Sequence, residues 1–127
     1  MSESASKAAV GSIVWTDLTV PDADRVRDFY AGVVGWKVQP VEMGGYSDYC
    51  MNETATGKTV AGVCHARGVN AKVPPAWIVY IVVENLAESL KRVRELGGEV
   101  IDGPRTMGSN TFAAIRDPAG AVCGLIE

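Results

Sequence analysis

Two segments of this sequence place aromatic and polar side chains at alternate positions, the spacing that puts them on one face of a strand. Trp15 and Asp17 alternate in the first segment, and Ile78 and Tyr80 alternate in the second. An inward carboxylate with a raised pKa can act as a general base, and an aromatic ring can stack on a planar ligand. Where these faces line the hollow of a sheet, the pattern predicts a mostly apolar pocket with an aromatic platform and a few polar groups, the usual make-up of a small-molecule site.

Each of these residues also has a purely structural interpretation. Trp15 and Tyr80 can be side chains that fill the hollow of a sheet, and Asp17 can be a solvated carboxylate near its mouth. Cys64 can face the same hollow, but no cation or histidine lies close enough in sequence to lower its pKa, so we expect a buried, unreactive thiol. The single histidine, His65, is interpreted as a strand-edge or interface residue rather than a catalytic one.

Hydrophobic periodicity predicts the elements that must position these side chains. Helices are predicted between Asp22 and Gly35 and between Asn85 and Gly97, where the first residue of each pair is the expected N-cap and the glycine ends the helix. The pair Gly103-Pro104 is expected to separate two of the last strands. Strands are predicted over residues 13–20, 36–43, 46–51, 60–65, 77–83, 99–101, 110–116 and 121–126.

The two halves of the chain repeat each other at a nearly constant offset. Val20 corresponds to Val83, 63 residues further on. The chain is therefore predicted to be an α+β protein of two tandem βαβββ modules, residues 12–66 and 77–127, joined by a connector over residues 67–76. Since neither module can bury its sheet alone, we expect one curved, incomplete barrel-like sheet with the helices outside.

Composition and charge exclude several functional classes. The chain has 127 residues, enough for a single domain, and residues 1–11 are expected to form a loose tail. It has 12 Lys and Arg against 15 Asp and Glu, which gives a net charge of −3. A nucleic-acid partner needs a concentrated basic surface, and a membrane span needs ~20 apolar residues. Three cysteines without a C-x-x-C spacing fit a reducing compartment. We expect a cytoplasmic protein without nucleic-acid or membrane partners.

Three segments of the sequence carry a family resemblance. They read LTVPDADRVRDFYAGVVGW at residues 18–36, VVENLAESLKRVRELGGEV at residues 82–100 and RDPAGAVCGLIE at residues 116–127. With these segments the chain resembles the vicinal oxygen chelate family, which includes glyoxalases, extradiol dioxygenases and bleomycin-resistance proteins. The resemblance implies paired βαβββ modules and a homodimer. It leaves the reaction open, because this fold hosts many chemistries.

Metal-dependent members of the family hold a divalent ion with two histidines and two glutamates. The resemblance places these four positions at Trp15, Gly62, Ile78 and Gly124, none of which has a metal-binding side chain. His65 lies three positions beyond Gly62 and is expected to point to the opposite face. We therefore expect no metal and no cofactor, as in a metal-free branch of the family. The two glycines are expected to leave room where other members carry carboxylates.

The favoured hypothesis is a metal-free glyoxalase-like or bleomycin-resistance-like protein that binds a small apolar or aromatic ligand. The alternative is a metal-independent isomerase or lyase that uses Asp17 or Tyr80 as acid or base, and no catalytic residue is assigned. A third hypothesis is a regulatory or structural partner whose hollow is filled. The expected ligand-binding residues are Trp15, Asp17, Gly62, Cys64, Ile78, Tyr80 and Gly124.

Overall fold

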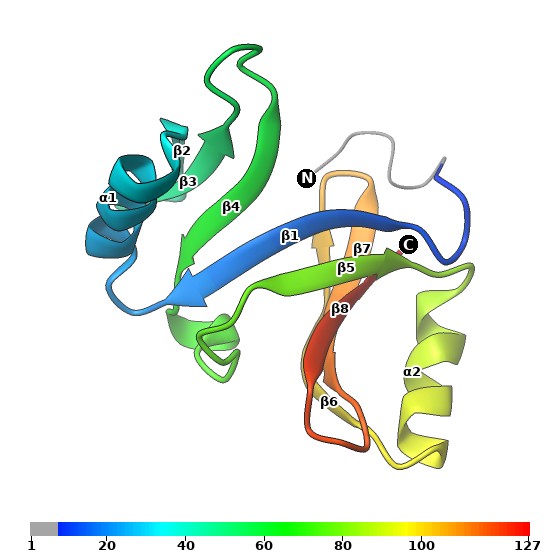
Figure 1. The fold of residues 1–127 in the computed structure, drawn as a ribbon. Coiled ribbons are helices and arrows are strands. Elements are labelled where there is room, and N and C mark those ends of the chain that lie inside the picture. Colours follow the sequence, from blue (N-terminus) through cyan, green and yellow to red (C-terminus); the bar gives the residue numbers. More distant parts are fainter. Residues whose placement is uncertain (1–7) are drawn as a thin grey trace. The chain divides into compact units, whose positions relative to one another are not determined.

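The computed structural model of the chain describes residues 8–127 (Figure 1). They form two compact units, an N-terminal unit of residues 16–77 and a C-terminal unit of residues 8–15 and 78–127. Strand β1 (Ile13–Val20) begins in the C-terminal unit and continues into the N-terminal unit. Each half of the chain follows the order βαβββ, so the predicted α+β class and the tandem modules are confirmed.

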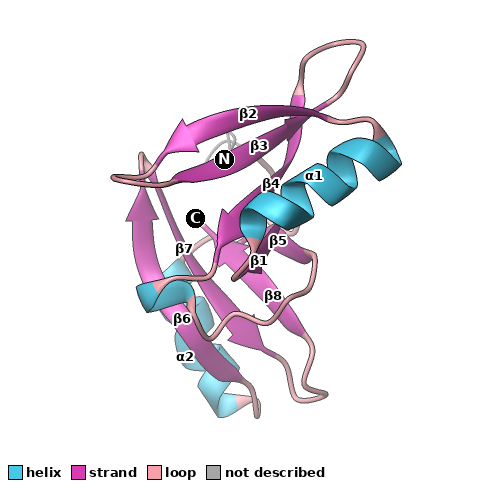
Figure 2. Cartoon of the chain, turned by 90° about the vertical axis from the view of Figure 1, so that its left-hand side faces the viewer, coloured by secondary structure: helices cyan, strands magenta, loops and turns pink. Residues whose placement is uncertain are grey.

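The N-terminal unit pairs its strands in the order β2-β3-β4-β1. After β1 come α1 (Ala23–Val34), β2 (Lys37–Glu42), β3 (Ser47–Asn52) and β4 (Thr59–His65). Strand β4 is parallel to β1 and antiparallel to β3, and α1 packs on β4 and β2 (Figure 2). The buried core of this unit consists of Leu18, Val20, Ala23, Tyr49, Met51, Ala61 and Val63.

Helix α1 begins after Asp22 and ends at Gly35, as predicted. Gly35 has a φ of 86°, a left-handed conformation that glycine adopts without steric cost. Asp22 occupies the N-cap position, but among the described residues its side chain makes no capping hydrogen bond. The apolar side chains of α1 are only partly buried: Tyr30 packs on the core, whereas Phe29 and Val33 are 59% and 66% exposed.

The C-terminal unit pairs its strands in the order β5-β8-β7-β6. Its elements are β5 (Ile78–Val82), α2 (Leu86–Glu95), β6 (Glu99–Met107), β7 (Asn110–Arg116) and β8 (Val122–Ile126). Strand β8 is parallel to β5 and antiparallel to β7. The segment before β1 also belongs here, since the Gly11 N–H donates to the Val82 carbonyl and the Val82 N–H donates to the Ser12 carbonyl, both at 2.8 Å.

Helix α2 is fixed at its start by two side chains. Asn85 Oδ1 accepts the Glu88 N–H at 3.0 Å, which is the predicted N-cap. Glu127 Oε1 accepts the Leu86 N–H at 2.6 Å, so a carboxylate also meets the positive end of the helix dipole. The helix packs on β6 and β7 (Figure 1). The core beneath it consists of Leu86, Leu90, Ala113, Ile115 and Leu125, the last of which lies on β8.

The prediction that Gly103-Pro104 ends a short strand is wrong. Strand β6 continues through this pair to Met107 and stays paired with β7. The register shifts on both sides of Asp102, before Arg105, and such bulges accommodate a proline. The missing proline N–H is tolerated because β6 is the edge strand of this unit.

The predicted connector contains one short 3-10 helix, η2 (Gly68–Asn70). The Arg67 N–H donates to Asn70 Oδ1 at 2.6 Å, and the Asn70 amide donates to the His65 carbonyl at 3.1 Å. These bonds attach the connector to the end of β4. None of the helices in residues 8–127 has the length and apolar character needed to cross a membrane.

Candidate functional site

Tyr80 covers Gly124 in the C-terminal unit. The register of β5 and β8 places the two Cα atoms opposite each other, and a Cβ added to Gly124 would overlap the tyrosine ring. The Tyr80 ring packs edge-on against Phe112 at 6.2 Å, and the Arg105 guanidinium stacks 5.0 Å from the centre of Phe112. The expectation that Gly124 leaves open space is therefore wrong, because the Tyr80 ring occupies that space.

The other two predicted site residues of this unit differ in accessibility. Ile78 is 1% exposed and belongs to the buried interior. Trp15 is partly exposed, whereas Tyr80 is 8% exposed and Gly124 is buried. Trp15 is therefore the predicted ligand-binding side chain of this unit that a solvent-borne molecule can reach without repacking the core.

In the N-terminal unit, Asp17, Gly62 and Cys64 occur on neighbouring strands. The parallel pairing of β1 and β4 puts Asp17 opposite Gly62, and Cys64 follows two residues later on the same side of β4. Burial raises the pKa of the Cys64 thiol, and the negative charges of Asp17 and Asp48 raise it further. This environment favours the protonated, unreactive thiol that the sequence predicts.

His65, the last residue of β4, is held between two carboxylates. Its Nδ1 lies 3.3 Å from Asp48 Oδ1, and its backbone N–H donates to the same oxygen at 2.9 Å. Its Nε2 lies 3.5 Å from Asp24 Oδ1 at the start of α1, and the Tyr49 hydroxyl also donates to Asp24. These contacts fasten the first turn of α1 to β3 and β4.

Aromatic rings and guanidinium groups surround this cluster. The Tyr46 ring meets the His65 ring edge-on at 5.5 Å, and Arg67 stacks 3.9 Å from the centre of Tyr46. Arg27 stacks 4.5 Å from the centre of Tyr49. The imidazole is 17% exposed and is fixed on both of its nitrogens. The cluster is therefore best explained as a structural junction.

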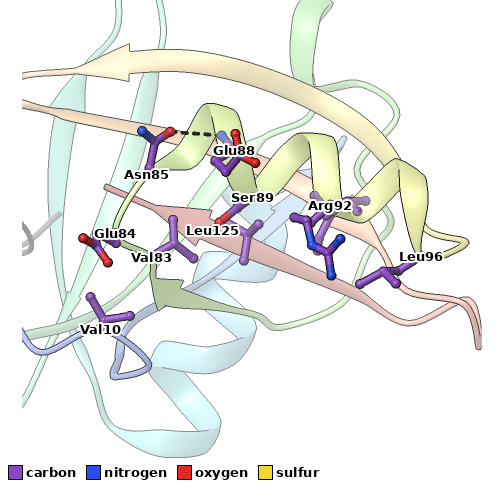
Figure 3. Close-up of a pocket in the computed structure, with 11 residues that line it drawn as sticks. Val10, Val83, Glu84, Asn85, Glu88, Ser89, Arg92, Leu96 and Leu125 are labelled. Atoms are coloured by element: carbon purple, nitrogen blue, oxygen red, sulfur yellow. Dashed lines mark hydrogen bonds between the residues drawn. The ribbon is translucent and has the colours of Figure 1, made fainter.

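A groove of about 850 Å³ opens beside α2 in the C-terminal unit (Figure 3). Its charged groups are Glu84 and Glu88 toward the start of α2 and Arg92 one turn further on. Asn85, whose side chain caps the helix, also borders it. Its apolar lining consists of Val10, Val83, Val93, Leu96, Ile115 and Leu125. The size falls in the range of small-molecule pockets, but the groove is open to solvent.

The architecture of both halves is shared with known proteins. Paired βαβββ modules are the architecture of glyoxalase-like proteins. The family model described as Glyoxalase/Bleomycin resistance protein/Dioxygenase superfamily matches residues 12–123. The chain belongs to this family, and the resemblance to the vicinal oxygen chelate family is confirmed.

Three relatives illustrate the similarity. The anthracycline biosynthesis protein DnrV of Streptomyces peucetius is 32% identical over 91% of this chain and 46% of its own length. The putative glyoxylase CFP32 of Mycobacterium tuberculosis is 32% identical over 91% of this chain and 45% of its own length. The chain thus spans about half the length of these relatives. A crystal structure of methylmalonyl-CoA epimerase from M. tuberculosis shares the fold, with a TM-score of 0.52, 17% identity and coverage of 94% and 91% of the two chains.

The metal site of the wider family does not fit this chain. Three of the four corresponding positions, Trp15, Ile78 and Gly124, lie in the C-terminal unit, where the Tyr80 ring takes the space in which a carboxylate at position 124 would extend. Among residues 8–127, no three His, Cys, Asp or Glu side chains are grouped so that they could hold an ion. The side chains at the family's ligand positions therefore do not match the donor set that a divalent ion needs.

Sequence reasoning missed two features of the structure. It treated His65 alone, although Asp24 and Asp48 bracket it, because these partners are 41 and 17 residues away in the chain. It also missed the groove beside α2. The sequence contains a pattern that could have indicated it: Glu88, Arg92 and Leu96 recur every four residues and therefore lie on one side of that helix.

Proposed function

We propose that this protein is a metal-free member of its family that binds a small, planar, apolar or aromatic ligand. Two features of the same unit carry the proposal. Trp15 is partly exposed, and Tyr80 leaves no room for a metal-binding side chain at position 124. Trp15 is the proposed stacking residue. Of the other residues expected to bind a ligand, Ile78, Tyr80 and Gly124 belong to the same unit as Trp15, and Asp17, Gly62 and Cys64 belong to the N-terminal unit.

The relatives support a small-molecule ligand and suggest where to begin. The name of the S. peucetius relative concerns anthracycline biosynthesis, so fused-ring aromatic natural products are the first compounds to test. A planar aromatic body suits an indole platform, because offset stacking contributes about 0.5 to 1.5 kcal/mol beyond the buried area.

The alternative is an isomerase or lyase that uses Asp17 or Tyr80 as acid or base without a metal. Of the two groups, Asp17 is the more accessible, since it is partly exposed whereas Tyr80 is 8% exposed. Turnover of a bound ligand that is lost in Asp17→Asn, with binding retained, would favour the enzyme. Binding without turnover would favour the binding protein.

The proposal includes a homodimer in the cytoplasm. The family resemblance supports the dimer. The three cysteines Cys50, Cys64 and Cys123 are free thiols, which suits a reducing compartment.

Tryptophan fluorescence combined with calorimetry tests the proposed binding. Fused-ring phenols and quinones should change the emission of the wild type, and Trp15→Ala should weaken their binding by about tenfold or more once lost contact area is added to the stacking term. Trp36→Ala is the matched control, because Trp36 packs with Tyr30 and Trp77 instead. It should lower stability without changing affinity.

A different outcome of the same experiment would assign Trp15 a structural role. If no compound binds, and Trp15→Ala destabilises the fold as severely as Trp36→Ala, then Trp15 is a filling side chain. The structural-partner hypothesis would then replace ligand binding.

A further inference from the structure

The groove beside α2 has opposite charge at its two ends. Glu84 lies with Val10 at one end, and Arg92 lies with Leu96 toward the other (Figure 3). Val10 and Leu96 are 64% and 63% exposed, although both are large apolar side chains. Both border the apolar lining of the same groove, and exposed apolar patches commonly mark interaction sites.

We propose that this groove, together with the bordering face of α2, is the surface through which two copies of the chain pair about a two-fold axis. A two-fold interface is self-complementary, because residue i meets residue j and residue j meets residue i. An acidic end and a basic end on one surface satisfy this condition when the second copy runs in the opposite direction. This inference rests on the homodimer proposed above and names its surface.

The spacing along α2 gives the register of the pair. When two antiparallel copies of α2 cross at the level of residue 90, Glu88 faces Arg92 of the second copy, and Arg92 faces Glu88 of the second copy. The same register brings Leu96 to the end of the groove that holds Val10 and Val83 of the second copy. In this arrangement the interface covers Glu88 and Arg92 of both copies and the exposed Leu96 side chain of each copy.

The α2 side chains that would make these contacts are exposed to solvent. Glu88, Arg92 and Leu96 follow one another at intervals of four and share one side of the helix. Arg92 pairs with Glu95 at 3.0 Å, but both side chains are largely exposed, at 59% and 44%, and such pairs contribute little. The floor of the groove, Ile115 and Leu125, is apolar and would be closed off from water.

Sedimentation equilibrium of three charge variants tests the register. Glu88→Arg alone puts like charges at both contacts, and so does Arg92→Glu alone, so each should raise the dimer dissociation constant by roughly tenfold or more. An equimolar mixture of these two variants should restore the dimer, since both contacts of the mixed pair again join an acid to a base. Lys91→Glu makes the same charge change as Arg92→Glu outside the groove lining and should leave the dimer intact.

Leu96→Glu is a second probe that does not depend on the charged pair. Leu96 is mostly exposed, so this variant should keep the wild-type circular dichroism while becoming monomeric. A dimer that survives all of these substitutions, or a mixture that fails to reassemble, would overturn this surface but not the homodimer. A monomeric wild type would overturn both, and ligand binding at Trp15, measured separately, would stand in either case.

Discussion

The aromatic ring of Tyr80 lies so close above the Cα of Gly124 that residue 124 has no room for a side chain. The two residues face each other across the parallel pair of β5 and β8, and Tyr80 is 8% exposed. The family resemblance assigns a metal-binding carboxylate to this position, whereas here it is part of a packed aromatic contact. A glutamate introduced at residue 124 alone would therefore collide with the tyrosine ring.

Gly124→Ala should destabilise the protein by about 1 to 3 kcal/mol, the usual cost of overpacking a buried position. The same substitution made in a Tyr80→Ala background should be nearly neutral, because the ring that it would strike is gone. Urea unfolding of the four proteins gives the coupling between the two sites. Equal costs in both backgrounds would show that the ring does not restrict residue 124.

Elemental analysis of untagged protein should find well under one divalent ion per chain. The expectation follows from the side chains at Trp15, Gly62, Ile78 and Gly124, which offer no ligand atoms. Adding zinc, nickel, manganese or iron should leave the melting temperature unchanged, since an ion that binds only the folded state raises it. A stoichiometric, stabilising ion would contradict the proposed metal-free character.

Asp48→Ala should cost about 1.5 to 3 kcal/mol, because Asp48 accepts the His65 N–H and also faces the imidazole. His65→Gln should cost less, since the backbone bond to Asp48 remains. Asp28→Ala is the control, as Asp28 is 70% exposed in its pair with Arg27 and should matter little. If Asp48→Ala proves as mild as Asp28→Ala, the junction at the end of β4 does not stabilise the fold.

The Cys64 thiol should make the protein less stable in alkaline solution. Its pKa is raised in the folded state by burial and by Asp17, whereas the thiol of the unfolded chain ionises near pH 8.5. Above that pH the folded state binds more protons than the unfolded state, so the free energy of unfolding falls as the pH rises. Cys64→Ala should remove this part of the decline between about pH 8.5 and 10. An identical decline in the variant would assign the effect to other groups.

Local signals predicted most of the fold because each depends on a few neighbouring residues. The cap at Asn85 and the glycine that ends α1 are examples, since their geometry follows from a single side chain or its absence. The course of β6 was missed because hairpin pairing with β7, which joins Asp102 to Ala114 and Arg105 to Phe112, carries the strand through Gly103-Pro104. Pairing between strands overrides the local preference of proline here.

The candidate site was less predictable for a related reason. Strand periodicity grouped Trp15 with Asp17 and Ile78 with Tyr80, since side chains alternate along a strand. The pairing of Asp17 with Gly62 and of Tyr80 with Gly124 depends on the register between strands, which periodicity does not give. Periodicity could not show that the Tyr80 ring folds over Gly124, because a side-chain rotamer depends on packing with Phe112. It also could not separate the buried Ile78 from the accessible Trp15.

The cluster of Tyr30, Trp36 and Trp77 gives the protein an internal optical reporter. The two indoles lie 5.9 Å apart at 70°, and the Trp77 indole N–H donates to the Tyr30 hydroxyl at 3.1 Å. Such fixed, asymmetric aromatic packing produces near-ultraviolet circular dichroism, which disappears when specific packing is lost. Because all three rings belong to the N-terminal unit, their contribution to this signal follows the order of that unit, while the contribution of Trp15 to the emission reports on the other unit.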